Sequence, residues 1–159
     1  ANEDDPASAK TSQELCPPGY YCPGDGLRHK CEAGYYGENT GLAIPTCDGI
    51  CQPGYYCPSG STSSHQVPCG NATVVCADGS SKPQPVLPGY YSASSLNNNI
   101  QISELSYAGP NSTQDIVIQC EIGHYCQEGV KYQCPGGTYG KHNGAVDVSD
   151  CHICPAGYY

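Results

Sequence analysis

"CPPGYYCP", residues 16–23, sets two cysteines six positions apart around a Gly-Tyr-Tyr core. The core returns as "CQPGYYCP" from Cys51, as "VLPGYYS" from Val86 with both cysteines lost, as "CEIGHYC" from Cys120 and as "CPAGYY" from Cys154. Consecutive copies start 34 or 35 residues apart. A period of this length is typical of tandem modules that are too small to bury an apolar face alone and therefore pack against their neighbours.

The period divides the chain into six segments. We expect a flexible acidic arm, two cysteine-rich repeats of which the second ends in a proline-rich connector, a cysteine-free β-hairpin repeat, another cysteine-rich repeat and the start of a truncated fifth repeat. In this order, the segments are residues 1–15, 16–50, 51–85, 86–119, 120–153 and 154–159.

The composition explains why these repeats need cysteine. Leu, Ile, Val and Phe make up 22 of the 159 residues, a share at which a chain usually remains disordered. Thirteen cysteines supply the missing constraint, because a disulfide that closes a loop of about 15 residues stabilises a fold by about 3 kcal/mol. The predicted fold class is therefore small disulfide-rich tandem repeats, built from short β-hairpins and loops with little helix and arranged as an elongated rod.

Twelve cysteines fall into three sets of four, one set in each cysteine-rich repeat, so we expect two disulfides within each of these repeats. Three pairings are possible within each set, and the sequence does not choose among them. Cys154 is left over and opens the fifth copy of the motif, so we expect it to be unpaired within this chain or to bridge to another repeat. The predicted disulfide cysteines are Cys16, Cys22, Cys31, Cys47, Cys51, Cys57, Cys69, Cys76, Cys120, Cys126, Cys134 and Cys151.

Twelve of the fourteen tyrosines lie in seven Gly-x-Tyr elements, while Phe, Trp and Met are absent. We expect the tyrosine rings to cover a disulfide and the next repeat, with each hydroxyl reaching water or a carbonyl group. Exposed platforms for sugar rings and oxidative tyrosine cross-linking are the two alternatives. The tyrosines assigned to repeat packing are Tyr20, Tyr21, Tyr55, Tyr56, Tyr90, Tyr91, Tyr125, Tyr158 and Tyr159.

The third repeat has no cysteine, and two of its stretches alternate apolar and polar residues as half-buried strands do. We expect these stretches, "NNNIQISELSY" and "STQDIVIQC", to pair as a hairpin around the turn "AGPNS", with Ile116 and Ile118 on the returning strand. Before this repeat, Pro83, Pro85 and Pro88 predict an extended, semi-rigid connector rather than a packed element.

Two sequons and one serine-rich stretch are candidate sites for glycans. Asn71 in "NAT" and Asn111 in "NST" are N-glycosylation sequons, and both lie where turns are expected. The stretch "SGSTSS" is a candidate O-linked cluster. Its hydroxyl-bearing residues are Ser59, Ser61, Thr62, Ser63 and Ser64.

The density of cysteine predicts an extracellular or cell-surface protein, because disulfide frameworks persist in oxidising compartments. The chain begins "ANEDDPASAK" without a methionine, which suits a mature N-terminus after removal of a signal peptide and equally a fragment of a longer array. No apolar run reaches the roughly 20 residues of a membrane span. The net charge of −9 disfavours nucleic acid and anionic membranes as partners.

The sequence gives no positive sign of catalysis, a cofactor or a metal. "CHIC" at Cys151 to Cys154, together with His124, Cys126 and Cys134, could form a zinc site, but the period explains these cysteines better as the end of one repeat and the start of the next. Histidines such as His29, His65, His142 and His152 lie in polar stretches and are expected to be solvated. We therefore expect no enzyme, no cofactor and no metal ligand.

The repeats resemble the ephrin-receptor-like cysteine-rich modules of the growth-factor-receptor and tumour-necrosis-factor-receptor type. The resemblance is carried by the motif that begins at Cys16, by its copies at Cys51, Cys120 and Cys154, and by the internal "GYYG" and "GTYG" elements; it covers residues 16–159 except the third repeat, which fits poorly. Members of this family are extracellular, elongated and non-catalytic, and similar arrays occur in protist surface proteins, including those of flagellar hairs. The resemblance implies an extracellular rod.

Two functions follow from these expectations. The favoured one is a structural extracellular glycoprotein, the subunit of a glycan-coated surface filament whose copies assemble head to tail, with other copies and covalent glycans as its partners. Regular spacing, low charge density and surfaces rich in Ser, Thr, Asn, Gly and Pro favour it. The alternative is the ligand-binding ectodomain of a cysteine-rich receptor, for which an apolar or aromatic anchor rimmed by charge would be expected.

Overall fold

The computed structural model describes residues 12–95 and 109–159. Within these residues the chain forms seven two-stranded antiparallel sheets, here called hairpins 1 to 7 in chain order, and its only helical element is the short 3-10 helix η1 (Val148–Asp150). The paired strands are β1 (Tyr20–Tyr21) with β2 (His29–Lys30), β3 (Tyr35–Tyr36) with β4 (Gly49–Ile50), β5 (Tyr55–Tyr56) with β6 (Val67–Pro68), β7 (Val74–Val75) with β8 (Gln84–Pro85), β9 (Tyr90–Ala93) with β10 (Ile116–Gln119), β11 (His124–Gln127) with β12 (Val130–Gln133), and β13 (Thr138–Gly140) with β14 (Cys151–Ile153).

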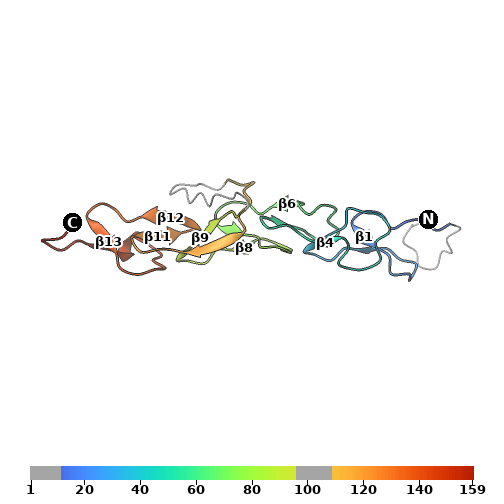
Figure 1. The fold of residues 1–159 in the computed structure, drawn as a ribbon, viewed down its shortest axis with the longest axis horizontal. Helices are drawn as coiled ribbons and strands as arrows, with labels where there is room; N and C mark the ends of the chain where they lie inside the picture. Colours follow the sequence, from blue (N-terminus) through green and yellow to red (C-terminus); the bar gives the residue numbers. More distant parts are fainter. Residues whose placement is uncertain (1–11, 96–108) are drawn as a thin grey trace.

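The hairpins follow one another along a single long axis, with the two termini at opposite ends (Figure 1). The molecule exposes 10048 Å² of surface, about a third more than the roughly 7,600 Å² of a compact chain of this size. The elongated shape and the disulfide-linked hairpins confirm the predicted fold class. The structural unit is, however, a single hairpin: residues 16–50, 51–85 and 120–153 each hold two hairpins, and residues 86–119 hold one.

Six of the seven Gly-x-Tyr elements open a hairpin through the same β-turn. In hairpin 1 the Tyr20 amide donates to the Pro17 carbonyl at 3.2 Å, and Gly19 at the third turn position has a φ of +78°. A type II turn requires a positive φ at this position, which glycine adopts without steric cost, and proline is common at the second position. The repeated motif is therefore a turn signal that precedes a short strand.

Hairpin 4 makes its turn with a different sequence. The Val74 amide donates to the Asn71 carbonyl at 3.3 Å, and the Asn71 side-chain oxygen accepts a hydrogen bond from the Thr73 amide at 3.0 Å. An asparagine side chain that bonds the backbone two residues later mimics a backbone turn. The Asn71 sequon thus replaces the glycine turn of the other hairpins.

Disulfides take the place of an apolar core. Every hairpin except hairpin 5 holds one disulfide, and the largest fully buried side chains of the described residues are all cysteines. The S–S bonds join Cys16 to Cys22, Cys31 to Cys47, Cys51 to Cys57, Cys69 to Cys76, Cys120 to Cys126 and Cys134 to Cys151.

In the third repeat, strand β10 pairs with the Gly-Tyr-Tyr strand β9, with Ile118 opposite Tyr91. The alternating stretch that was expected to pair with it, residues 97–107, lies outside the described residues. The pairing with β9 places Ile118 against the buried group formed by Tyr91, Cys120 and Cys126.

The proline-rich connector is also partly structured. Gln84 and Pro85 form strand β8, which pairs with Val74 and Val75, and the Val86 amide donates to the Thr73 carbonyl at 2.8 Å. Proline is compatible with a strand that has an unpaired edge, because its missing amide can face away from the ladder. The connector is therefore extended and exposed at Gln84 and Pro85, and it forms the second strand of hairpin 4.

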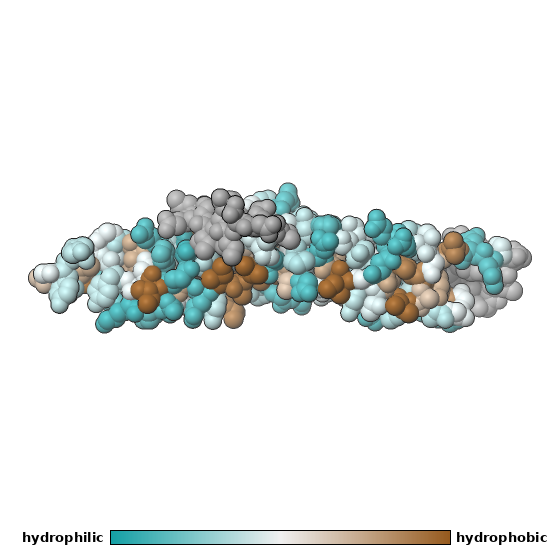
Figure 2. Space-filling model, in the orientation of Figure 1, coloured by the Kyte–Doolittle hydropathy of each residue, from teal (hydrophilic) through white to brown (hydrophobic). Residues whose placement is uncertain are grey.

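The surface is mainly polar, and its apolar side chains form separate spots along the rod (Figure 2). Exposed examples are Leu87, Val117 and Ile122. Scattered single residues of this kind are normal on protein surfaces. Among the described residues, no helix has the length and apolar character needed to cross a membrane.

Candidate functional site: the joints between hairpins

The most regular feature of the molecule is the set of hydrogen bonds that joins each hairpin to the next. The amide that follows the first two strand residues of each hairpin donates to a carbonyl in the loop of the next hairpin. Six such bonds, each 2.9 Å long, link hairpins 1 to 7 without a break: Cys22 to Leu42, Gly37 to Ser61, Cys57 to Ser80, Cys76 to Gln114, Ser92 to Gly129 and Cys126 to Ala145.

A second bond runs in the opposite direction at four of the six joints. The residue just before each accepting carbonyl is then a glycine, and its amide donates to the carbonyl of the first cysteine in the preceding hairpin. The bonds are Gly41 to Cys16 at 2.8 Å, Gly60 to Cys31 at 2.9 Å, Gly79 to Cys51 at 2.8 Å and Gly144 to Cys120 at 2.7 Å. Because each pair of bonds fixes two points of a loop, it fixes the direction of the next hairpin.

The turn glycines of hairpins 1, 2, 3 and 5 also touch the hairpin after the next one. A Cβ atom added at Gly19 would lie 2.6 Å from the Gly60 carbonyl oxygen in hairpin 3. At Gly89, the added atom would lie 2.6 Å from the Gly144 carbonyl oxygen in hairpin 7. Only glycine permits this close approach of backbones. Hairpins 1, 2, 3 and 5 are therefore each tied to two successors.

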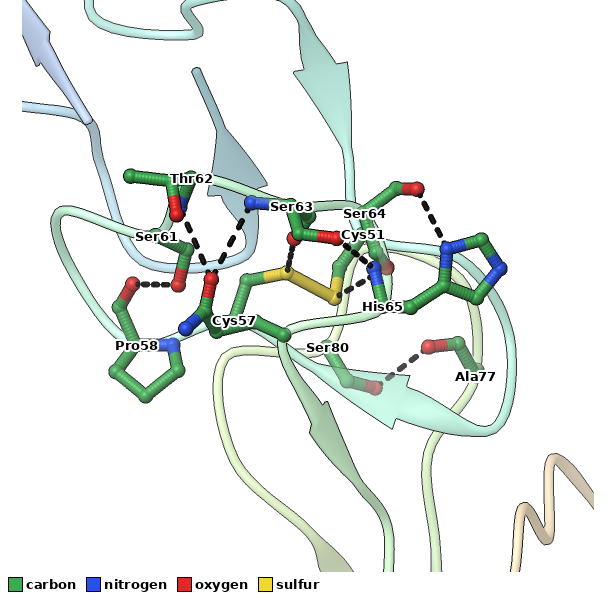
Figure 3. The surroundings of a disulfide bond; sticks show 11 residues. Cys51, Cys57, Pro58, Ser61, Thr62, Ser63, Ser64, His65, Ala77 and Ser80 are labelled. Carbon is green, nitrogen blue, oxygen red and sulfur yellow. Dashed lines mark hydrogen bonds between the residues drawn. A yellow bond between two sulfur atoms is a disulfide. The ribbon is translucent and has the colours of Figure 1, made fainter. Parts of the chain in front are cut away.

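The disulfides lie at these joints. Around Cys51–Cys57 the carbonyl oxygens of Ser64 and Ser63 lie 3.3 Å and 3.4 Å from the two sulfur atoms, and the neighbouring serines form further hydrogen bonds (Figure 3). The Cys57 amide donates to the Ser80 carbonyl of hairpin 4. The loop of hairpin 3 therefore folds around its own disulfide while binding hairpin 4.

The serine-rich stretch is part of this folded loop. Ser61 is buried, and its hydroxyl donates to the Pro58 carbonyl at 2.6 Å. The Ser59 hydroxyl donates to the Cys31 carbonyl of hairpin 2 at 3.0 Å, and Ser63 Oγ accepts from the His65 amide at 3.2 Å. Thr62 is exposed. The sequence prediction treated this stretch as a glycan acceptor and missed its role in the joint.

The tyrosine rings make their ring contacts across their own hairpins. Tyr125 stacks on Tyr132 with ring centroids 5.3 Å apart. Three further pairs join tyrosine to histidine: Tyr21 with His29 at 5.3 Å, Tyr55 with His65 at 4.8 Å and Tyr139 with His152 at 5.9 Å. The three histidines were expected to be merely solvated. Two of the pairs, those of hairpins 1 and 7, are direct cross-strand neighbours, a relation visible only once the register is known.

Tyr91 is the exception, since it alone among the tyrosines of the described residues is buried, with 4% of its surface exposed. Its hydroxyl donates to Glu121 Oε1 at 3.0 Å, and Lys131 Nζ lies 3.3 Å from Glu121 Oε2 and 4.9 Å from the centre of the Tyr91 ring. These three residues join hairpin 5 to hairpin 6. Sequence reasoning assigned Tyr91 to packing and missed Glu121 and Lys131.

The ionisation of this cluster reflects its contacts. Burial, followed by the hydrogen bond to Glu121 and the charge of that carboxylate, raises the pKa of Tyr91 to about 12. Burial opposes ionisation of Glu121, but hydrogen bonds from its own amide and from Tyr91, together with the Lys131 charge, lower the pKa of Glu121 below its ordinary value. The cluster therefore holds a neutral tyrosine and an ionised carboxylate over a wide pH range.

Hairpin 5 replaces its missing disulfide with polar contacts at the previous joint as well. Ser92 occupies the position of the second cysteine of hairpins 1, 3 and 6, is buried, and donates through Oγ to the Ala72 carbonyl of hairpin 4 at 2.8 Å. Gly129 of hairpin 6 approaches the same carbonyl so closely that an added Cβ would overlap it. Three hairpins therefore meet at Ala72.

The remaining predicted sites lie on the surface or near the end of the described chain. Asn71 and Asn111 are both exposed. Cys154 has no disulfide partner in the described residues, and Tyr158 and Tyr159 are exposed. Cys126 and Cys134 are held in disulfides, and no group of three or more potential metal ligands occurs within residues 12–95 and 109–159.

Comparison with known proteins adds no assignment. The sequence matches no protein-family model, and a search of curated proteins finds no significant match. What the chain shows by itself is a small disulfide-rich protein of paired β-hairpins, whose six disulfides indicate an oxidising environment.

Proposed function

We propose that this protein is a non-catalytic structural glycoprotein of the cell surface, a rod-shaped subunit of an extracellular filament. The observation that carries the proposal is the unbroken series of backbone hydrogen bonds through all six joints. In such a chain each hairpin fixes the position of the next one, so the rod keeps its shape without a large core. The resemblance to ephrin-receptor-like cysteine-rich modules supports the same extracellular, elongated role.

We further propose that copies of the protein assemble head to tail through the same contacts that join its hairpins. At the joints, a loop glycine donates to a cysteine carbonyl, and the carbonyl of the next residue accepts the returning amide. In hairpin 1 the corresponding loop residues are Gly26, with a φ of +83°, and Leu27. In hairpin 7 the corresponding partners are the Cys134 carbonyl and the Gly140 amide. One copy's Gly26 would thus bind the next copy's Cys134.

The exposure of the turn glycines agrees with this arrangement. Gly19, Gly34, Gly54 and Gly89 are buried by later loops, whereas Gly137 of hairpin 7 is exposed. A Cβ added at Gly137 meets no atom within 4 Å. This face can therefore receive the loops of another copy. A head-to-tail contact of this kind propagates into an open filament when its rotation does not close a ring.

The test is assembly of the secreted protein, followed by light scattering and electron microscopy over a range of concentrations. We expect filaments for the native protein and folded monomers for Gly137→Arg, because the new side chain occupies the receiving face. Gly109→Arg adds the same charge and bulk in the middle of the rod, where an added Cβ meets nothing within 4 Å, and should still assemble. A monomeric native protein at high concentration would contradict the filament and favour a receptor ectodomain.

A further inference from the structure

Two sequons that lie 40 positions apart in the sequence meet at one place on the rod. The Gly70 amide of hairpin 4 donates to the Ser112 carbonyl in the long loop of hairpin 5 at 3.0 Å. Asn71 directly follows the donor, and Asn111 directly precedes the acceptor. Because consecutive Cα atoms are about 3.8 Å apart, the Cα atoms of the two asparagines are separated by at most about 15 Å.

The geometry at Asn71 suits a glycan acceptor. Asn71 Oδ1 accepts hydrogen bonds from the Thr73 amide at 3.0 Å and from the Thr73 hydroxyl at 2.5 Å. The backbone donor fixes which side-chain atom is the oxygen, so the nitrogen Nδ2, to which an N-linked sugar is attached, is the atom turned away from this turn. Asn71 is exposed, so Nδ2 is accessible.

The geometry at Asn111 also suits a glycan acceptor. Asn111 is exposed in a turn that is closed by the Ser112 amide donating to the Gly109 carbonyl at 3.1 Å. The third sequon residue, Thr113, is held against hairpin 3, where a Cβ added at Gly54 would lie 2.7 Å from Thr113 Cβ. The backbone after Asn111 is therefore fixed to the rod while the Asn111 side chain faces solvent.

We infer that Asn71 and Asn111 both carry N-linked oligosaccharides and that these form one two-chain glycan cluster at the joint between hairpins 4 and 5. Residues 1–159 contain no third Asn-x-Ser/Thr sequon, so N-linked sugar forms one band along this part of the rod rather than a continuous coat. The inference rests on the extracellular role proposed above. The cluster borders hairpin 5, the hairpin without a disulfide, and its fitting partner is a sugar-binding protein with two binding sites.

The first test is glycan occupancy in protein secreted from a eukaryotic host. Asn71→Asp is the matched variant, because aspartate keeps the oxygen that accepts from Thr73 but forms no sequon. Enzymatic removal of N-glycans should lower the mass of the native protein by two glycans, of Asn71→Asp or Asn111→Asp by one, and of the double variant by none. A native protein found bare at either asparagine overturns the inference.

The second test is proximity, measured with a probe of two lectin domains joined by a flexible linker. Two glycans within reach of one probe convert its second binding step into an intramolecular one. We expect the native protein to bind the probe at least tenfold more tightly than either single variant, while a single lectin domain shows no more than a twofold difference. A twofold difference with the two-domain probe overturns the cluster. Retention inside the cell with reduced thiols would instead count against the proposed function.

Discussion

At the scale of single residues, cysteine and glycine carry the interactions that larger apolar residues carry in most proteins. Cysteines are the fully buried side chains, and glycines allow backbones of different hairpins to touch. The contrast between two turn glycines makes this testable. Gly89 and Gly137 occupy the same turn position with φ values of +82° and +81°, but only Gly89 lies against another backbone.

Gly89→Ala should therefore destabilise the protein more than Gly137→Ala. Both substitutions place a Cβ on a backbone with positive φ, which costs about 1 kcal/mol. At Gly89 the Cβ must also displace the Gly144 carbonyl, which we expect to add about 1 to 3 kcal/mol. Denaturant unfolding of the two variants measures the difference. Equal losses would show that the contact between hairpins 5 and 7 contributes nothing.

The second prediction for a single residue concerns the pH dependence of the stability that Tyr91 contributes. Its pKa is raised to about 12, so its contribution to stability is complete below its ordinary pKa near 10 and is lost as the pH rises from about 10 to about 12. The pKa of Glu121 is lowered, so its contribution is complete above its ordinary pKa and is lost as the pH falls through the lowered value. The cluster thus stabilises the joint from mildly acidic to mildly alkaline pH.

Tyr91→Phe removes the hydroxyl and leaves the ring. We expect a loss of about 1 kcal/mol at pH 7, because the hydrogen bond to Glu121 disappears. The stability of the variant should also fall less than that of the native protein between pH 10 and 12, because the variant has no hydroxyl to ionise at position 91. Tyr90→Phe, one residue away on the same strand, is the control and should keep both. Unchanged stability and an unchanged alkaline profile in Tyr91→Phe would contradict the role of the cluster.

At the scale of elements, hairpin 5 differs from the other six in having no disulfide. Val86 and Ser92 occupy the positions that cysteines fill in hairpins 1, 3 and 6, and the separation of six residues is the same. In those three hairpins the Cα atoms of the bridged cysteines are 5.8, 5.8 and 5.7 Å apart, within the range that disulfides require. Tyr91, Glu121, Lys131 and Ser92 replace this covalent link with noncovalent contacts.

The double substitution Val86→Cys and Ser92→Cys should therefore form a seventh disulfide. A loop of this size restricts the unfolded chain by about 2 kcal/mol, and loss of the Ser92 hydrogen bond to Ala72 offsets about 1 kcal/mol of that gain. The oxidised variant should unfold at a higher temperature than Ser92→Ala, which loses the same hydrogen bond without gaining a bridge. Free thiols at both positions after oxidation would show that hairpin 5 lacks the geometry of its neighbours.

The contrast among elements also explains how far the sequence predicts the structure. Hairpins that begin with Gly-x-Tyr are predictable, because the turn chemistry lies in adjacent residues. Hairpin 4 is not, since it lacks that motif and its second strand contains Pro85. The pairing of β9 with β10 is equally hidden, because a long loop separates the strands. The joints themselves are made by backbone groups. The only sign of them in the sequence is therefore the spacing of the glycines.

At the scale of the whole molecule, the joints turn seven marginal hairpins into one rod. An isolated two-stranded hairpin is barely stable in water, and the buried apolar side chains here are few. Each joint adds at least one backbone hydrogen bond to the next hairpin, and the turn glycines of hairpins 1, 2, 3 and 5 add a close contact with the hairpin beyond it. The stiffness of the rod is therefore a property of the series of joints.

Small-angle X-ray scattering of the monomeric protein shows whether the joints make the rod stiff. A compact chain of 159 residues has a radius of gyration of about 15 Å. We predict a clearly larger value, scattering of the form given by a thin rigid rod with one cross-section, and loss of that form when the six disulfides are reduced. A radius near 15 Å, or scattering typical of beads on a flexible string, would contradict the continuous rod.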